Sequence, residues 1–479
     1  MRDVKPRVQP ALQPVPDRLR NFDEMIQGYA LEDALEEARR CILCKSARCQ
    51  GACPLGNRIP QWIAELQQGR FEEAYRIIRE ISPMPELCSR LCPQERLCEG
   101  ACALGIKHEP VAIGLLERFV CDQNRARPNG VDPTPATAPM TGSKRVAAIG
   151  SGPASLAFAQ AMARAGHRVT VFERWPKLGG VLRWIPRFKL PSELLDAHLA
   201  MLTRMGVTFY TNTEVSWIES LLTDEDFEGV FIGIGASRPS MPQLPGESLK
   251  GICSSTEFLV RTFYSREELP NDWEPIADVI GRRVVVLGGG DSAMDCVRTA
   301  LRLNAAEVTC AYRRDEANMP GSKKEVRAAK EEGANLQWLT APVAFHSDDG
   351  RSVSQVECLR MELGPPDASG RRSPKPILNS AFRMEADLVV LAFGYEVESV
   401  FDNEHFFLMA PPKGTVRANP NTGATALRGV FAGGDCVTGP NLVCTAARAG
   451  LTAAQHMLRY FAGEPWDVLT AAPVVGSQA

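Results

Sequence analysis

Apolar residues in the first part of the chain recur at helical spacing. Between residues 61 and 81 they predict one or two helices, with one face formed by Ile63, Leu66, Phe71, Ala74, Ile77 and Ile78. Residues 22–40 are rich in Glu, Ala, Leu and Arg and predict a further helix, as do residues 111–120. We therefore predict an all-helical domain over residues 1–127.

From residue 143 the pattern changes to short apolar runs that end in glycines. Residues 144–150 and 282–288 share a basic start, an apolar strand and a glycine turn, which predicts two Rossmann-like units. Strands then alternate with helices, as in α/β folds with parallel sheets. Four prolines within residues 128–142 predict a linker between the helical domain and these units.

Composition narrows the class of protein. The chain has 479 residues, which favours about three domains over a single core. Its net charge of −3 gives no reason to expect a nucleic acid or an anionic membrane as partner. Residues 146–163 lack charge, but their glycines favour a strand–turn–helix unit over a membrane span. Residues 1–16 lack the apolar core of a signal peptide, so we expect a reducing cytoplasm and free thiols.

Eight cysteines lie in two runs before residue 103, at the close and irregular spacing that a cuboid cluster requires. A proline follows one cysteine in each run, as in bacterial ferredoxins. Zinc also takes four thiolates, but only one pair here has the C-x2-C spacing that zinc sites usually repeat. We predict two 4Fe–4S clusters, with the candidate ligands Cys41, Cys44, Cys49, Cys53, Cys88, Cys92, Cys98 and Cys102.

The first glycine turn has the pattern of a dinucleotide site. Its glycines follow an apolar strand and precede a helix whose N-terminal N–H groups would face a pyrophosphate. The next strand ends in an acid, which suits a ribose hydroxyl. Ser155 stands where a third glycine or alanine is usual. The candidate binding residues are Gly150, Gly152, Pro153, Ala154, Glu173, Gly179 and Gly180.

The second glycine turn repeats this pattern, and the strand that follows ends in two arginines. An arginine there accommodates the 2′-phosphate of NADP, so we predict NADPH rather than NADH. The alternative for the arginines is a solvated strand end. The candidate residues are Gly288, Gly290, Asp291, Ser292, Ala293, Arg313 and Arg314. For Asp291 we favour a structural role at the helix N-terminus.

A late apolar strand ends in Gly433, Gly434 and Asp435, where an aspartate could hold a flavin ribityl hydroxyl. Clusters carry single electrons and a nicotinamide carries a hydride, so a chain with both also needs a flavin to connect them. We predict that the later cysteines are buried small residues, among them Cys296, Cys310, Cys358, Cys436 and Cys444.

Taken together, these motifs resemble the small (beta) subunits of bacterial NADPH-dependent glutamate synthase. The resemblance extends from about residue 22 to about residue 463. It includes both cysteine runs, both glycine turns, residues 186–190, residues 312–315 and residues 432–435. Trp184 departs from the family, which tends to have a glycine there, and so does the strand end at residues 233–235.

The resemblance implies how the cofactors are held. One cluster would bind Cys41, Cys44, Cys49 and Cys102, and the other would bind Cys53, Cys88, Cys92 and Cys98. FAD would bind the first turn with Glu173 and Asp435, and NADPH would bind the second with Arg313 and Arg314. Further cofactor-contacting positions would be Lys189, Gly235, Gly394 and Gly434. The FAD domain would be discontinuous (residues 143–275 and 391–479), with the NADPH domain inserted as residues 276–390.

The resemblance also implies the function. Electrons would pass from NADPH through FAD and the clusters to a large glutamate synthase subunit, which makes L-glutamate from L-glutamine and 2-oxoglutarate. Two alternatives remain: the same module serving a pyrimidine reductase or a ferredoxin-linked enzyme, and a redox sensor with labile clusters. The chain starts Met1-Arg2, without an amidotransferase nucleophile, so the partner would supply that chemistry. No catalytic acid or base is expected in this chain.

Overall fold

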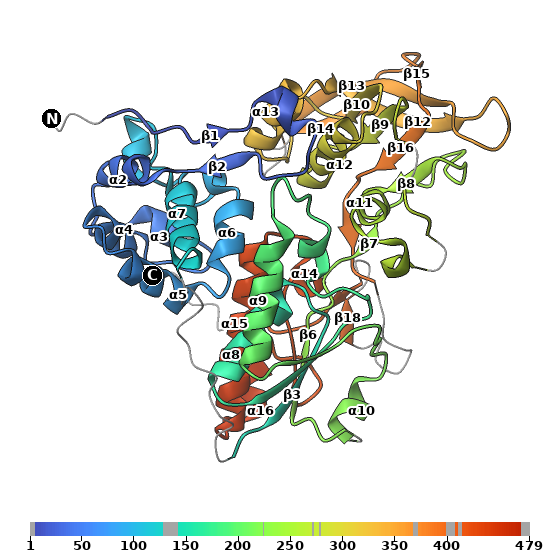
Figure 1. The fold of residues 1–479 in the computed structure, drawn as a ribbon. Coiled ribbons are helices and arrows are strands. Elements are labelled where there is room, and N and C mark those ends of the chain that lie inside the picture. The colour runs from blue at the N-terminus through green and yellow to red at the C-terminus, as the bar shows by residue number, and fades with distance from the viewer. Residues whose placement is uncertain are drawn as a thin grey trace.

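The computed structural model describes residues 5–127, 142–223, 225–270, 273–276, 279–366, 372–398, 408–410 and 414–470. Three units are visible in Figure 1: a helical N-terminal domain and two α/β units, each built on its own parallel sheet. The predicted linker lies almost entirely outside the described residues. No helix in the described part of the chain is long and apolar enough to cross a membrane.

The N-terminal domain is helical apart from one short ribbon. Its helices are α2 (Leu31–Arg39), α3 (Arg48–Ala52), α4 (Ile59–Gln67), α5 (Phe71–Ile81), α6 (Pro85–Leu91) and α7 (Ile113–Arg125). The predicted pair of helices over residues 61–81 is confirmed as α4 and α5. Their apolar faces bury Trp62, Ile63, Leu66 and Ile78 completely, which is the hydrophobic contribution that holds this small domain together.

The helix predicted over residues 22–40 begins later than expected. Residues Ile26–Gly28 form strand β2, which pairs antiparallel with β1 (Ala11–Leu12). Gly28 has a φ of +82°, a left-handed conformation that ends the strand before α2 begins. Composition alone favoured a helix here, but the pairing with β1 determines the structure instead.

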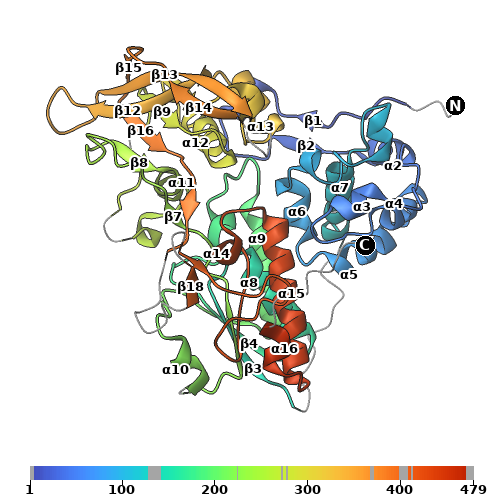
Figure 2. The same cartoon turned by 180° about the vertical axis from the view of Figure 1, so that it is seen from behind.

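The first α/β unit has a five-stranded parallel sheet in the order β20-β6-β3-β4-β5. Its strands are β3 (Arg145–Ile149), β4 (Arg168–Phe172), β5 (Thr208–Tyr210), β6 (Gly229–Ile232) and β20 (Val430–Ala432). Because β20 comes from the end of the chain, the unit is discontinuous. Helices α8 (Pro153–Arg164) and α15 (Val443–Phe461) pack together beside the sheet, as Figure 2 shows from behind. The other helices of this unit are α9 (Ser192–Arg204), α10 (Ile218–Thr223), α14 (Asp435–Thr438) and α16 (Trp466–Thr470).

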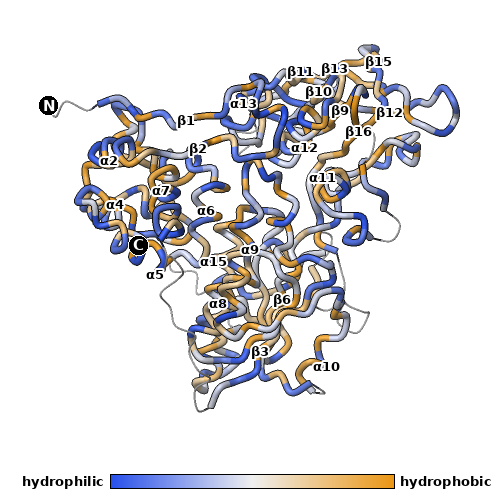
Figure 3. Tube along the Cα trace, viewed as in Figure 1, coloured by the Kyte–Doolittle hydropathy of each residue, from blue (hydrophilic) through white to orange (hydrophobic). Residues whose placement is uncertain are grey.

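The second α/β unit has a parallel sheet in the order β11-β10-β9-β16-β8. Its strands are β8 (Ile252–Ser254), β9 (Arg283–Leu287), β10 (Glu307–Tyr312), β11 (Asn335–Trp338) and β16 (Leu388–Leu391). Helices α11 (Ser255–Phe263), α12 (Asp291–Arg302) and α13 (Lys323–Glu331) accompany it. An antiparallel group adjoins this sheet, formed by β12 (Thr340–His346), β13 (Gln355–Pro366), β14 (Arg372–Pro376) and β15 (Phe382–Glu385). In Figure 3 the central strands of both sheets are mostly hydrophobic, as strands covered on both faces require.

The second unit starts earlier in the chain than residue 276. Strand β8 pairs with β16 in the second sheet, so residues 252–263 belong to this unit. A three-residue strand gives too short an apolar run to assign from sequence. The chain passes between the two units twice, at β7 (Arg238–Pro239) and at β17 (Tyr395–Glu396). These two short strands pair with each other.

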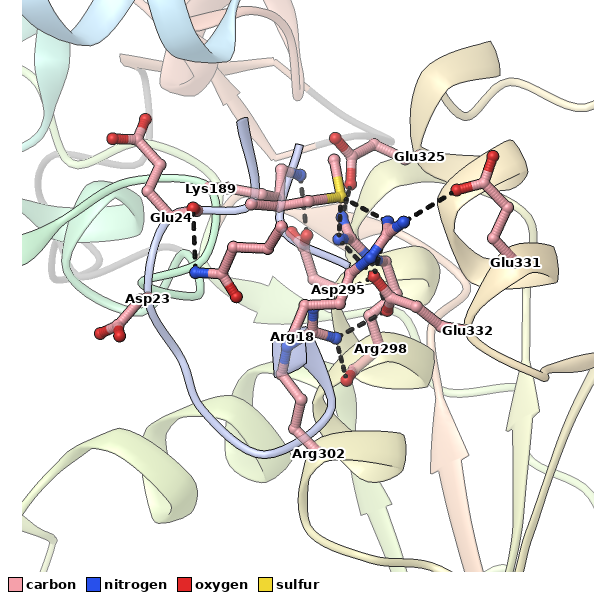
Figure 4. A network of polar contacts seen from close by, with 12 residues as sticks. Arg18, Asp23, Glu24, Lys189, Asp295, Arg298, Arg302, Glu325, Glu331 and Glu332 are labelled. Atoms are coloured by element: carbon pink, nitrogen blue, oxygen red, sulfur yellow. Dashed lines mark hydrogen bonds and ion pairs between the residues drawn. The ribbon is translucent and has the colours of Figure 1, made fainter. Parts of the chain in front are cut away.

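The N-terminal segment before α2 reaches the second α/β unit and helps to fix it. Arg18 forms ion pairs with Glu331 and Glu332, at 3.1 and 3.5 Å. Figure 4 shows that these groups join a buried network around Arg298 and Arg302 of α12. Such buried charges are tolerated because each is paired within the network. The network ties the segment, α12 and α13 together next to the cleft between the two α/β units.

Candidate cofactor site

A cleft of roughly 620 Å³ lies between the two α/β units and borders the helical domain. Residues of all three units line it: Gly150–Ala154 and Glu173 from the first, Gly290–Ser292 from the second, and Leu91 and Pro93 from the helical domain. This volume is in the range of known small-molecule sites. The sequence-predicted residues Gly180, Lys189, Gly235 and Asp435 also line it.

The first glycine turn has the backbone geometry that a pyrophosphate needs. Gly150 has a φ of +88°, and a Cβ there would lie 2.7 Å from the carbonyl oxygen of Gly233, so a side chain is excluded. A Cβ on Gly152 would meet nothing within 4 Å, so the backbone is open to the cleft. Helix α8 starts at Pro153 without a side-chain cap, which leaves its first N–H groups to a ligand.

Glu173 lies where β4 ends and organises the loop around the turn. Its carboxylate accepts hydrogen bonds from the backbone N–H groups of Ser151 and Trp175, both at 2.9 Å. The hydroxyl of Ser151 donates to Glu173 at 2.5 Å and accepts from the N–H of Gly179 at 2.8 Å. Gly179 and Gly180 both have positive φ values, of 120° and 52°. The acid therefore stands at the edge of the cleft and also holds the glycine pair in place.

Asp435 carries a buried polar atom that lacks a partner. Its Oδ1 makes no hydrogen bond to any described residue, and burial raises the pKa of this carboxyl to about 6. Gly434, with a φ of +82°, lets the chain approach α8 closely, since a Cβ there would lie 2.9 Å from the Cβ of Ala154. An unpaired acceptor of this kind fits a ligand hydroxyl. This observation, with the open glycine turn, shows that the residues present fit a flavin nucleotide.

The second glycine turn faces the first across the cleft. Gly288 has a φ of +148°, and a Cβ there would lie 2.3 Å from the carbonyl oxygen of Ala392. Gly290, which precedes α12, has open space where its Cβ would be. Asp291 accepts a hydrogen bond from the N–H of Ser322 at 2.9 Å, so it holds the loop before α13. Gly394 has a φ of +101° and accepts a hydrogen bond from the N–H of Ser240.

The two arginines after β10 differ in surroundings. Arg314 is buried, and it donates to the carbonyl oxygen of Arg372 at 2.9 Å and to the hydroxyl of Tyr312 at 3.3 Å. Its guanidinium therefore holds β14 against the sheet. Arg313 is exposed to solvent. Neither side chain belongs to the cleft wall, which on this side includes Ser322 and Lys324.

A buried ion pair joins the two α/β units at the cleft. The ammonium group of Lys189 lies 2.7 Å from a carboxylate oxygen of Asp295 in α12. Burial raises the pKa of Asp295 to about 6. The pKa of Lys189 is raised by the charge of Asp295, against the opposing effect of burial. Figure 4 shows this pair beside the arginine network of α12. Asp295 lines the cleft but was not selected from sequence as a binding residue, because only the fold brings it to Lys189.

Tryptophans form a second contact between the units. Trp175 and Trp184 line the cleft, and Trp175 packs on Trp273 with ring centres 5.9 Å apart. Trp184 is only 7% exposed and packs with the core of the second unit. Trp184 therefore replaces the expected glycine with an inter-unit contact. The sequence shows this departure from the family, but the contact that explains it is visible only in the structure.

The cysteines of the helical domain gather in two places. The first group consists of Cys41, Cys44, Cys49 and Cys102, which line one small cavity between α4 and the start of α7. Burial raises the pKa of the Cys41 and Cys49 thiols to about 11, and the neighbouring thiols add to the effect. Four thiols around one cavity are the donor set of an iron–sulfur cluster.

The second cysteine group consists of Cys53, Cys88, Cys92 and Cys98. Cys53, Cys88 and Cys92 pack in one apolar cluster, and Cys98 lies close enough to Cys53 for the two thiols to influence each other's pKa. No three His, Cys, Asp or Glu side chains of the described residues are arranged to hold a single metal ion. All seven cysteines outside the two groups are buried, as predicted for five of them. The thiol of Cys436 donates to the carbonyl oxygens of Ile232 and Gly433.

Known protein families match the same divisions of the chain. Residues 18–129 match the family described as dihydropyrimidine dehydrogenase domain II, 4Fe-4S cluster. Residues 144–450 match the pyridine nucleotide-disulphide oxidoreductase family. The chain is 41% identical to the putative oxidoreductase AegA of Escherichia coli, over 96% of this chain and 70% of that protein. It is 38% identical to the glutamate synthase (NADPH) small chain of Escherichia coli, over 95% of this chain and 97% of that one.

Solved structures agree with the fold of the two α/β units. FprA from Mycobacterium tuberculosis in complex with NADPH superimposes with a TM-score of 0.55 at 18% identity, covering 69% of this chain and 87% of that one. Thioredoxin reductase from Lactococcus lactis gives a TM-score of 0.50 at 20% identity, covering 67% of this chain and all of that one. The chain is thus an NADPH-dependent oxidoreductase and belongs to the family of iron–sulfur flavoproteins that includes the small chains of NADPH-dependent glutamate synthase.

Proposed function

We propose that this chain is the electron-input subunit of a larger enzyme, with NADPH as donor and a large glutamate synthase subunit as acceptor. The observation that carries the proposal is the position of Cys92. Its chain neighbours Leu91 and Pro93 both line the cleft, while Cys92 itself belongs to the second cysteine group. One short segment therefore separates the nucleotide cleft from a set of cluster ligands.

Each cysteine group is proposed to hold one 4Fe–4S cluster. The first group would supply Cys41, Cys44, Cys49 and Cys102, which share a cavity. The second would supply Cys53, Cys88, Cys92 and Cys98. FAD would lie on the first glycine turn, with its ribose at Glu173 and its ribityl chain at the unpaired oxygen of Asp435. When bound, these groups convert a two-electron hydride donor into a source of single electrons.

The protein side chains orient the reactants and exclude water. Gly290 and the N-terminus of α12 would hold the NADPH pyrophosphate, since space there is open. Arg313 is the exposed arginine at the strand end and would contact the 2′-phosphate, whereas Arg314 would support it by holding β14. The Lys189–Asp295 pair and Trp184 keep the two units in contact, so that the cleft closes around both nucleotides.

The proposed exit lies at the first cysteine group. Cys44 borders an open groove together with Lys45, Gln50 and Arg448. Next to it, Ile42 and Leu43 are 46% and 38% exposed, so two neighbouring apolar side chains are available to a partner. A partner that covers this surface would take electrons from the outer cluster.

A second candidate is the same module serving a different oxidoreductase. It is favoured by the 41% identity to AegA and to UacF, both named putative oxidoreductases of Escherichia coli. A direct test is to mix the anaerobically purified chain with a large glutamate synthase subunit and supply NADPH, glutamine and 2-oxoglutarate. Glutamate formation supports the first candidate. Rapid NADPH oxidation with an artificial acceptor, but no glutamate, supports the second.

A further inference from the structure

A fifth thiol adjoins the second cysteine group. Cys444 is 1% exposed and lies in the first turn of α15, in the first α/β unit rather than in the helical domain. It packs in the same apolar cluster as Cys53, Cys88 and Cys92. Its side chain neighbours that of Cys92, which in turn neighbours that of Cys88. Three neighbouring thiols therefore connect α15 with the second group.

Cys444 and Cys92 both lie next to residues of the cleft wall. Residues Pro440–Val443 line the cleft immediately before Cys444, and Leu91 and Pro93 line it on either side of Cys92. Cys444 and Cys92 are thus each adjacent in the chain to residues of the cleft wall, and they pack in one apolar cluster. No other cysteine outside the two groups is seen in this position among the described residues: Cys121, for example, packs in the core of the helical domain.

The chemistry of the donor set distinguishes Cys444 from its neighbours. Cys53, Cys88, Cys92 and Cys98 already supply the four thiolates that one cluster needs. A thiol loses its proton when it binds iron, so Cys92 could then only accept a hydrogen bond. Cys444, outside this set of four, keeps its S–H group and faces the Cys92 sulfur. Hydrogen bonds to cluster sulfurs raise the reduction potential, because they stabilise the more negative reduced form.

We propose that the Cys444 thiol donates a hydrogen bond to the Cys92 thiolate and thereby raises the reduction potential of the cluster nearest the flavin. This inference rests on the proposed function, since it requires a cluster in the second group. Cys444 would act as a tuning residue that makes this cluster a better acceptor for electrons leaving the cleft. It contacts the ligand and not the iron.

The test is a reductive titration of the loaded, full-length chain, followed by electron paramagnetic resonance under anaerobic conditions. The variants are Cys444→Ala, which removes the donor, and Cys444→Ser, which keeps a hydroxyl donor of similar size. Cys121→Ala is the matched control, because it removes a buried thiol of the helical domain that lies outside both groups. Iron and flavin contents are measured on every sample before the titration.

We expect Cys444→Ala to weaken electron uptake by one of the two clusters about tenfold, which is about 59 mV for a one-electron couple. Cys444→Ser should shift the potential by no more than half as much, because the hydroxyl still donates. Cys121→Ala should leave both potentials unchanged. Unchanged potentials in Cys444→Ala, or equal shifts in all three variants, would overturn the inference. A loss of iron in Cys444→Ala would also overturn it, because Cys444 would then be a ligand. A wild-type chain without iron would instead refute the proposed function itself.

Discussion

The two cysteine groups each contain four thiols but differ in their surroundings. The first group lies next to the exposed side chains of Ile42 and Leu43, and its Cys44 borders an open groove that Cys53 of the second group also reaches. In the second group Cys88 is buried, and with Cys53 and Cys92 it packs in the same apolar cluster as Met84 and Leu87, next to the wall of the nucleotide cleft. In the proposed function, the second (inner) group would receive electrons from the cleft and the first (outer) group would deliver them to the partner.

The largest effect should follow from removing a ligand of the inner group. Cys92→Ala should lower the iron content from about eight to about four per chain, because a 4Fe–4S cluster with three ligands is lost on purification. NADPH should still bleach the flavin, but no cluster should become reduced, because electrons from the flavin would have to pass through the missing inner cluster. Iron analysis and paramagnetic resonance after NADPH addition measure both. Reduction of the remaining cluster at the normal rate would contradict the inner position of Cys92.

Removing a ligand of the outer group should give a different pattern. Cys44→Ala should also cost about four irons, but NADPH should still reduce the inner cluster, because the path from the cleft to the second group is intact. Transfer to the partner enzyme should fall below detection. Identical spectra of Cys44→Ala and Cys92→Ala after NADPH addition would contradict the proposed difference in role between the two groups. Cys358→Ala, which removes a buried thiol of the antiparallel group, serves as the control.

A change at the NADPH site precedes both cysteine groups on the proposed path, so it should slow the reduction of both clusters equally. Arg313→Ala removes the exposed guanidinium proposed to contact the 2′-phosphate, and a charge-assisted contact of this kind contributes about 1.5–3 kcal/mol. We expect the KM for NADPH to rise about 10–100-fold while the KM for NADH stays within about twofold, since NADH lacks that phosphate. Arg360→Ala, an arginine stacked on Phe382 of the antiparallel group, is a matched control. An equal rise in KM for NADPH and NADH would contradict the contact with the 2′-phosphate and would leave Arg313 as a solvated residue at the strand end.

The smallest expected effect concerns Asp435 and pH. Burial raises the pKa of this carboxyl from 3.8 to about 6 in the folded protein, so without flavin the folded state binds more protons than the unfolded chain between about pH 4 and 6. Stability should fall as pH rises through this window, by at most about 3 kcal/mol. In Asp435→Asn, the free energy of unfolding should differ less between pH 4.5 and pH 7. Chemical unfolding of the flavin-free protein at these two pH values measures this difference. A wild-type profile identical to that of the variant would argue against a buried carboxyl here.

Local spacing was enough to predict much of the site. The two glycine turns and the eight cysteines are short motifs, and the conformation of each depends on nearby residues, so their positions could be read from the sequence. The contacts that connect the units could not. Lys189 and Asp295 are far apart in the chain, as are Cys92 and Cys444, and only the packing of helices and sheets brings each pair together. The same holds for β8, which is too short to predict and yet belongs to the second sheet.

The most direct test of the account is an anaerobic titration with NADPH of the purified chain, after iron, sulfide, zinc and flavin analysis. The account predicts about eight irons and one FAD per chain, with the flavin and then both clusters reduced by NADPH in preference to NADH. Zinc in place of iron, or clusters that stay oxidised while the flavin is reduced, would contradict the proposed path from the cleft through the inner group to the outer one.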